Sequence, residues 1–282
     1  MRWQGRAGSG NIEDRRGMGM ALPIGGGIGG LVLLLLFSAL TGQNPADLIN
    51  VANDQTTGTS GVRGDDPQAE FVSVVLADLE DTWSEIFRAR SDTYTPPTLV
   101  LFTQATQSAC GLGQSAMGPF YCPSDRKVYL DLSFFHDLEN RFGAPGDFAQ
   151  AYVIAHEFGH HVQDALGIFD GVQSQQQSDP SKANELSIRL ELQADCLAGV
   201  WAHSIWAQPD QSDVESITEA DVREALTAAA AVGDDRIQEQ ATGTINKETW
   251  THGSADQRTT WFSTGFRVGT TESCDTFSVA TP

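Results

Sequence analysis

The chain has 282 residues, enough for one or two domains, and its 37 acidic against 17 basic side chains give a formal net charge of −20. Such a surface repels the phosphates of nucleic acids, and no basic patch or base-stacking motif offsets it, which argues against nucleic-acid binding. The acidity indicates solubility and a weak attraction for cations or basic ligands, without specifying either.

The N-terminal region is predicted to lie outside the folded domain. Residues 1–19 are polar and contain several glycines, which indicates a disordered tail. Residues 20–40 carry no charge, and at about 1.5 Å per residue such a segment spans the roughly 30 Å hydrocarbon core of a bilayer. Arginines precede this segment and none follows it closely, which places the N-terminus in the cytoplasm.

We therefore expect four parts: a cytoplasmic tail over 1–19, a single-pass transmembrane anchor over 20–40, a linker over 41–65, and one domain over 66–282 outside the cytoplasm. A cleavable signal peptide is the alternative to the anchor. The polar region before the apolar run is long for such a peptide, and no A-x-A cleavage site follows.

The domain is predicted to begin with a helix and a small antiparallel sheet. Asp66 and Pro67 form a helix start, and an apolar stripe follows them. Residues 98–102 and 127–132 are predicted strands, the second reached through a hairpin turn at 124–125. The edge of this sheet could pair with an extended peptide. The later periodic stretches are helical, so the expected fold class is α+β and mainly helical.

One run inside a helix predicted over 148–167 carries the chemistry. His156 and His160 are four residues apart and project from the same helical face, with Glu157 beside them. This H-E-x-x-H spacing supplies two neutral nitrogen ligands for Zn²⁺ and a carboxylate that acts as general base toward a water at the metal. His161 points about 100° away from its neighbour, so we do not expect it at the metal. The alternative is an exposed helix that carries its histidines by chance.

A tetrahedral Zn²⁺ needs a third protein ligand. The continuation H-x-x-G-x-x-H is excluded, because Gln163 and Leu166 stand at its glycine and histidine positions. Beyond a loop predicted over 167–184, an apolar helix carries Glu191 and Asp195 four residues apart. Buried acids need partners, so we expect Glu191 as the third ligand and Asp195 as the acceptor for the free ring N–H of a ligand histidine. The alternatives are Asp195 as ligand with Glu191 outside it, and a solvated acidic pair.

Four cysteines allow three pairings, and the sequence alone does not choose among them. We expect Cys110–Cys122, which brackets a glycine-rich loop, and Cys196–Cys274, which would tie the C-terminus to the core. Disulfides fit a domain outside the cytoplasm, whereas four reduced thiols would be expected inside it.

The C-terminal quarter contributes two weaker candidates. A helix is predicted over 213–232, and a capping box, Ser254 with Gln257, opens another. His252 lies just before this second helix, whose dipole would disfavour its charged form. A neutral His252, or Arg258, could hydrogen-bond the oxyanion formed when water attacks a carbonyl. Alternatively, His252 supports the turn and Arg258 pairs with a local acid.

With these residues in place, the chain resembles the putative neutral zinc metallopeptidase family of single-pass bacterial membrane proteins. The resemblance covers nearly the whole chain, with no departure at the motif positions, and implies a zincin-type peptidase domain with a glutamate as third ligand. It implies no substrate. The matching stretches are Met1-Arg2-Trp3-Gln4-Gly5, Tyr121-Cys122-Pro123, His156-Glu157-Phe158-Gly159-His160-His161-Val162-Gln163, Glu191-Leu192-Gln193-Ala194-Asp195-Cys196, His252-Gly253 with Gln257-Arg258, and Cys274-Asp275-Thr276-Phe277.

We therefore expect a membrane-anchored zinc endopeptidase with Zn²⁺ held by His156, His160 and Glu191, Glu157 as general base, and His252 at the oxyanion. The expected partners are a peptide or protein substrate and the membrane. Two alternatives stay open: a zinc amidase acting on cell-wall peptides, and a catalytically inactive, zinc-stabilised binding domain.

Overall fold

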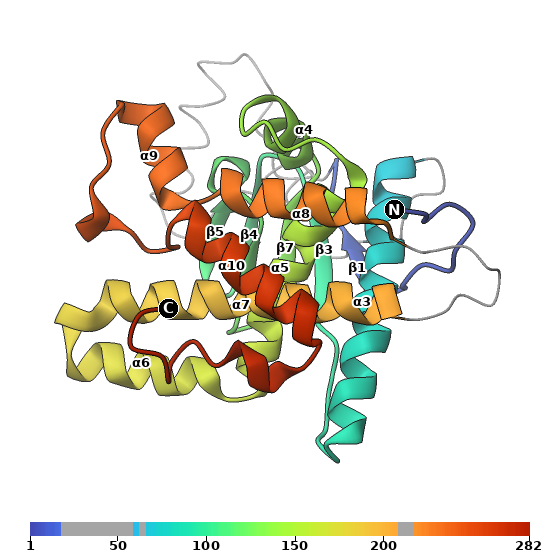
Figure 1. Ribbon diagram of the computed structural model, residues 1–282. Coiled ribbons are helices and arrows are strands. Elements are labelled where there is room, and N and C mark those ends of the chain that lie inside the picture. Colours follow the sequence, from blue (N-terminus) through green and yellow to red (C-terminus); the bar gives the residue numbers. More distant parts are fainter. Residues whose placement is uncertain (18–58, 62–65, 208–216) are drawn as a thin grey trace, which may run out of the picture.

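The helix that carries the two histidines, α5 (Asp147–Ala165), lies at the centre of the structure (Figure 1). The computed structural model describes residues 1–17, 59–61, 66–207 and 217–282. Helix α5 packs among other helices and against strands of the sheet, and nearly all of its side chains between Phe148 and Gln163 are buried, as expected for a helix surrounded on every side. The surrounding helices are α3 (Pro67–Ala89), α6 (Ile168–Ser178), α7 (Ala183–Ala207) and α8 (Glu219–Ala231).

The predicted α+β class, mostly helical with a small sheet, is confirmed, but the sheet is mixed rather than antiparallel. Its strand order is β2-β1-β3-β7-β6, and β1, β3 and β7 run parallel. The central strand β3 is buried from Leu99 to Phe102, which is typical of a parallel strand covered on both faces. The strands are β1 (Ile12–Asp14), β2 (Thr59–Ser60), β3 (Thr98–Phe102), β6 (Phe120–Cys122) and β7 (Lys127–Asp131).

The predicted hairpin into the last of these strands is confirmed, since β6 pairs with β7 in antiparallel fashion. A second hairpin pairs β4 (Ala105–Ser108) with β5 (Gly111–Gln114), and β5 falls within the glycine-rich loop predicted between Cys110 and Cys122. The disulfide Cys110–Cys122 joins this second hairpin to β6. Strands β4 and β5 are short and polar, and they have too few apolar positions for period-two alternation to be visible in the sequence.

The N-terminal segment differs most from its prediction. Residues 1–19 were expected to form a disordered tail, yet residues 1–17 pack on the domain, and Ile12 and Asp14 pair with Leu99 and Leu101 of β3. The Trp3 indole packs 5.5 Å from the ring of Phe71 and donates a hydrogen bond to Asp147 at the start of α5, 3.0 Å away. Residues 1–17 and the domain over 66–282 therefore form one folded unit.

Ile12 tests whether this segment contributes to stability. Its side chain is 2% exposed inside the main apolar core, so Ile12→Ala is expected to lower the free energy of unfolding by about 2–5 kcal/mol in urea denaturation. Leu112→Ala is the matched control. Leu112 lies on β5 and is 51% exposed, so this change should alter the free energy of unfolding by less than about 0.5 kcal/mol. Equal effects from the two changes would show that β1 is not part of the cooperative unit.

Two helices begin where a local capping signal predicted their start. The carboxylate of Asp66 accepts from the backbone N–H groups of Gln68 and Ala69, and Pro67 opens α3 as predicted. The Ser254–Gln257 capping box opens α10 (Ala255–Val268). Two helices were not predicted: α6 replaces the expected loop over 167–184, and α9 (Asp234–Thr242) follows α8. Both are polar, so they lack the apolar periodicity on which such a prediction depends. A short helix, α4 (Ser133–Asn140), precedes α5.

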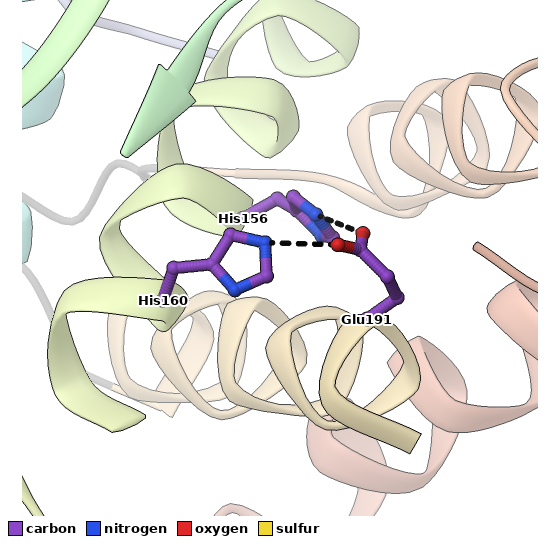
Figure 2. A group of neighbouring side chains, drawn as sticks. All are labelled: His156, His160 and Glu191. Carbon is purple, nitrogen blue, oxygen red and sulfur yellow. Dashed lines mark hydrogen bonds and ion pairs between the residues drawn. The ribbon is translucent and has the colours of Figure 1, made fainter. Parts of the chain in front are cut away.

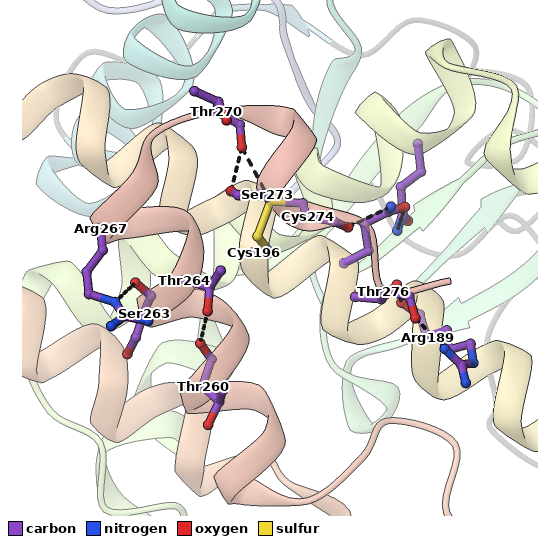
Figure 3. The surroundings of a disulfide bond; sticks show 12 residues. Arg189, Cys196, Thr260, Ser263, Thr264, Arg267, Thr270, Ser273, Cys274 and Thr276 are labelled. Atoms are coloured by element: carbon purple, nitrogen blue, oxygen red, sulfur yellow. Dashed lines mark hydrogen bonds between the residues drawn. A yellow bond between two sulfur atoms is a disulfide. The ribbon is translucent and has the colours of Figure 1, made fainter. Parts of the chain in front are cut away.

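Helices α7 and α10 cross at two glycines and are further joined by a disulfide. A Cβ placed on Gly265 would lie 1.9 Å from the carbonyl oxygen of Cys196, and one on Gly199 would lie 2.2 Å from that of Phe262, so only glycine permits this backbone contact. Figure 3 shows the Cys196–Cys274 disulfide, which ties α7 to the 3₁₀ turn Thr271–Cys274. The two expected disulfide pairs are thus the ones present in the structure.

The predicted anchor over 20–40 and nearly all of the predicted linker over 41–65 lie outside the described residues. Thr59 and Ser60, at the end of that linker, pair with β1. Within the described ranges, no helix is both long and apolar enough to cross a membrane.

Candidate metal centre

Three side chains converge where α5 packs on α7. His156 and His160 project from successive turns of α5, and Glu191 faces them from α7 (Figure 2). The Nε2 atom of His156 lies 3.1 Å from Glu191 Oε2, and the Nε2 atom of His160 lies 3.4 Å from Glu191 Oε1. One potential ligand atom from each of the three residues lies within 4.8 Å of those from the other two.

Gly159 brings the two helices close enough for this convergence. A Cβ at this position would lie 2.9 Å from the carbonyl oxygen of Ala194 and 3.1 Å from its Cα, closer than real side chains approach a backbone. The glycine between the two histidines therefore lets α5 contact the backbone of α7 directly. This contact places Glu191 opposite the imidazoles.

The donor set fits a zinc ion. Two imidazole nitrogens and one carboxylate are ligands that Zn²⁺ takes in sites that keep a position open for water or substrate. The Nδ1 atom of His156 lies 2.9 Å from Asp195 Oδ1, and that of His160 lies 2.9 Å from Gln163 Oε1. Because these oxygens only accept, each Nδ1 carries a proton, and each Nε2 is the atom left to bind a metal.

Asp195 is the centre of a buried polar network behind His156. It is fully buried and accepts hydrogen bonds from His156 Nδ1, the Tyr152 hydroxyl and the Arg258 guanidinium, which approaches at 2.8 and 2.9 Å. Burial alone would raise the pKa of Asp195, but the charges of Arg258 and His156 hold it below its ordinary value. Asp195 thus contacts His156 at Nδ1, while Glu191 faces the Nε2 atoms of both histidines.

Neighbouring charges also shift the pKa values of Glu191 and His156. Burial alone would raise the pKa of Glu191, but His160 and His156 hold it well below its ordinary value. Burial also opposes protonation of His156, but the neighbouring Asp195 and Glu191 raise its pKa to about 10. A metal ion and protons therefore compete for this site, as they do wherever imidazoles are ligands.

Arg258 lies in a different position from the one predicted for an oxyanion donor. Its side chain is 3% exposed, and its N–H groups donate to Asp195, to the Tyr152 hydroxyl at 3.2 Å and to the Val232 carbonyl at 3.2 Å. These contacts hold the guanidinium within the buried network around Asp195. They correspond to the alternative in which Arg258 pairs with an acid, although that acid is 63 residues away in the chain.

Gln163 is a site residue that the sequence analysis did not identify. Its carbonyl oxygen accepts from His160, while its Nε2 donates to the Leu190 carbonyl at 2.7 Å and to the Gln193 side chain at 3.0 Å. Gln163 thus fixes the ring of His160 as Asp195 fixes that of His156. Its position three residues after a ligand, on the same face of the helix, was the available signal.

The His161 ring has partners other than the three converging side chains. Its Nε2 lies 2.9 Å from the Thr95 carbonyl and its Nδ1 lies 3.1 Å from the Tyr121 hydroxyl. The ring is 2% exposed and holds the edge strand β6 against α5.

His252 is held by Asp234, a partner that the sequence did not indicate. Its Nδ1 lies 3.2 Å from Asp234 Oδ1, and Asp234 Oδ2 accepts from the backbone N–H groups of Thr251, His252 and Gly253. The hydrogen bond with Asp234 raises the pKa of His252, and burial opposes this rise only in part. The expectation that the α10 dipole favours a neutral ring is therefore wrong, because the carboxylate is closer and carries a full charge.

The metal-binding residues lie in a cleft of about 1140 Å³. Glu157 lines this cleft beside the ligands and is 9% exposed, while His252 lines it from the α9–α10 connection. Phe120 and Tyr121 of the edge strand β6 form part of its wall. The cleft is larger than the roughly 300–1,000 Å³ of typical small-molecule pockets and can hold several residues of a peptide.

The fold and the site define an α+β protein in which two histidines and one glutamate, a set that could hold a metal ion, line a large cleft. Residues 1–277 match the family described as "Putative neutral zinc metallopeptidase", and the chain belongs to this family. The match includes the N-terminal segment that supplies β1.

Two similar proteins carry names that state no activity. The Escherichia coli (strain K12) protein YpfJ, described as uncharacterized, is 46% identical over 292 residues, which cover 98% of this chain and 99% of that protein. The uncharacterized protein Rv2575 of Mycobacterium tuberculosis (strain H37Rv) is 48% identical over 192 residues, 66% of this chain and 64% of its own. No solved structure matches the chain.

Proposed function

We propose that the protein is a zinc-dependent endopeptidase with a zincin-like catalytic domain. The observation that carries the proposal is the convergence of His156 Nε2, His160 Nε2 and the Glu191 carboxylate at the wall of a peptide-sized cleft that Glu157 also lines. Zinc, when bound there, supplies a Lewis acid that lowers the pKa of water and polarises a carbonyl.

Glu157 is the proton carrier in this proposal. Its carboxylate accepts a proton from water as the water oxygen adds to the peptide carbonyl carbon, and it returns that proton to the amide nitrogen as the carbon–nitrogen bond breaks. The protonated ring of His252 donates a hydrogen bond to the carbonyl oxygen while that oxygen carries negative charge. Asp195 and Gln163 keep the two ligand rings from rotating.

The edge strand supports a peptide as the substrate class. β6 has one strand partner among the described residues, β7, and in this proposal an extended substrate chain pairs with its other edge. The Tyr121 hydroxyl donates to Asp164 at 2.8 Å and lies 3.1 Å from His161, which fixes the strand on α5. A peptide paired with β6 would therefore pass over the helix that carries His156 and His160.

Digestion of an unbiased peptide library by the wild type and Glu157→Gln, side by side, tests the proposal. The wild type should cut, and Glu157→Gln should lose about 10²- to 10⁴-fold in rate while keeping its zinc, because the amide cannot carry the proton. Equal cutting by both proteins would contradict the assigned base. No cutting by zinc-loaded wild type would favour the inactive binding domain, and cutting confined to cell-wall peptides would favour the amidase.

The Asp234–His252 pair predicts a pH dependence. If the protonated His252 ring acts as donor, activity is present below its pKa and is lost as the pH rises through it. Asp234 raises that pKa, so Asp234→Asn should move the alkaline limb of the kcat/KM profile to lower pH, and His252→Ala should remove the limb. An alkaline limb that is the same in all three proteins would assign it to another group.

We propose further that the domain lies outside the cytoplasm, acts on a peptide or protein rather than a nucleic acid, and is held to a membrane through residues 20–40. The two disulfides support an oxidising compartment. The pairing of β1 with β3 adds a constraint, because residues 1–17 and 66–282 can fold together only on the same side of a membrane. This constraint opposes a single crossing with residues 1–19 in the cytoplasm.

Cysteines introduced at two exposed positions test the shared side. Gln4→Cys and Glu139→Cys should react equally with a membrane-impermeant maleimide in intact cells. Reaction at position 139 alone would instead support a cytoplasmic location for residues 1–19.

A further inference from the structure

Three bulky apolar side chains that line the cleft form a group that we call the apolar lobe: Met117, Phe134 and Phe142. The rings of Phe134 and Phe142 lie 6.4 Å apart, and both pack on the main core of the protein. Met117 is 70% exposed, the largest exposed fraction among the large apolar residues that the structure describes. An apolar surface left uncovered at the wall of a cleft marks a place where a ligand group is buried.

The apolar lobe is preformed. Met117 belongs to the short 3₁₀ turn Ser115–Met117, and Ser115 donates its hydroxyl hydrogen bond to Asp131 at the end of β7. Asp131 also accepts from the backbone N–H of Gln104 at 2.7 Å and from that of Ser133 at 3.0 Å, which ties the turn to the start of α4. A Cβ on Gly118 would lie 3.4 Å from the Phe134 ring, so the turn rests on that ring.

Away from the catalytic candidates Glu157 and His252, the lining of the cleft offers no unpaired charge to a substrate side chain. Apart from those two residues, the three converging side chains and the buried network, the charged residues among the described ones that line it are Asp137 and Arg141. These two pair with each other at 3.1 Å, and the guanidinium also lies over the Phe142 ring at 5.7 Å. This neutrality is notable in a chain of net charge −20, whose overall acidity would by itself favour basic partners.

We propose that the cleft selects peptide segments with a bulky apolar side chain, of the phenylalanine, leucine or methionine type, and that Met117 with Phe134 and Phe142 receives that side chain. This inference deepens the proposed endopeptidase function and rests on it for the cutting step. A bulky apolar side chain gains from burial on the lobe, whereas a charged one would lose its hydration without finding a partner. The lobe belongs to the same cleft as Glu157 and the metal-binding residues, so the occupant is the chain that would be cut.

Peptide binding to full-length, zinc-loaded Glu157→Gln tests the inference without requiring hydrolysis. The probes are blocked hexapeptides that differ at one central position, which carries Phe, Leu, Ala, Glu or Lys. The Phe and Leu peptides should bind about 10- to 100-fold more tightly than the other three. Adding Met117→Glu should reduce this preference about tenfold and improve binding of the Lys peptide.

Leu112→Glu is the matched control. Leu112 is also a large, exposed apolar residue, 51% exposed, but it lies outside the cleft, so this change should leave all five affinities as they were. Equal affinities for the five peptides, tighter binding of the Lys peptide, no binding of any of them at about 1 mM, or a Met117→Glu variant indistinguishable from the control would each overturn the inference.

The two proposals can fail separately. If the Phe and Leu peptides bind selectively but wild type cuts none of the five, the selectivity is upheld and the endopeptidase proposal fails. If wild type cuts all five at similar rates, the endopeptidase proposal is upheld and the selectivity is overturned.

Discussion

Asp195→Asn is expected to lower the free energy of unfolding by about 3–5 kcal/mol, because it leaves the guanidinium of Arg258 buried without an anion. The partners left to Arg258 in this variant are neutral: the Tyr152 hydroxyl, the Val232 carbonyl and the one amide oxygen that replaces a carboxylate oxygen at position 195. The measurement is urea unfolding in the presence of a chelator, so that metal binding does not add to the stability of the folded state.

The paired variant Asp195→Leu with Arg258→Met separates stability from metal binding. It removes both charges, so most of the lost stability should return. Zinc affinity should not return with it, because nothing then holds the Nδ1 proton of His156, and the loss of such a partner costs about 10- to 100-fold in metal affinity. A stability change within about 0.5 kcal/mol for Asp195→Asn would show that this network does not form.

Glu191→Ala is expected to reduce zinc affinity by more than about 100-fold, beyond the range for residues that only hold a ligand in place. The physical reason is that Glu191 is the only carboxylate in the group of three residues whose ligand atoms converge. Competition with a chromophoric chelator measures the affinity, and His156→Ala should give a loss of similar size.

Glu219→Ala is the matched control for that experiment. Glu219 lies on α8 with its side chain 84% exposed and pairs only with Arg223 at 3.6 Å, so its removal should leave zinc affinity unchanged. Undiminished zinc affinity in Glu191→Ala would instead make Asp195 the third ligand and leave Glu191 outside the metal.

The parts of the site that were predictable depend on spacing along one helix. His156, Glu157 and His160 lie within five residues, and the 3.6-residue period of a helix by itself puts the two rings on one face. Glu191 and Asp195 were recognisable for a related reason, since two acids one turn apart on an apolar helix must find cationic partners inside the protein. Their separate roles, however, depend on which of them faces the Nε2 atoms, and that follows from the packing of α5 on α7 through Gly159.

The parts that were missed depend on contacts between segments far apart in the chain. Asp234 holds His252 across 18 residues, and Arg258 reaches Asp195 across 63. Strand β1 is only three residues long, and its pairing with β3 adds a parallel strand that no local periodicity could indicate. The same pairing decides that residues 1–17 belong to the folded unit rather than to a separate tail.

By itself, the sequence determined the reaction class to be tested, the candidate metal ligands and the mainly helical α+β class, because these follow from composition and from periodicity within single helices. Only the tertiary structure decided the mixed sheet, the partners that orient the two ligand rings, the buried position of Arg258 and the apolar lobe of the cleft. Each of these requires segments that are distant in the chain to meet, and the free energy that brings them together comes from burial in a shared core rather than from any local pattern.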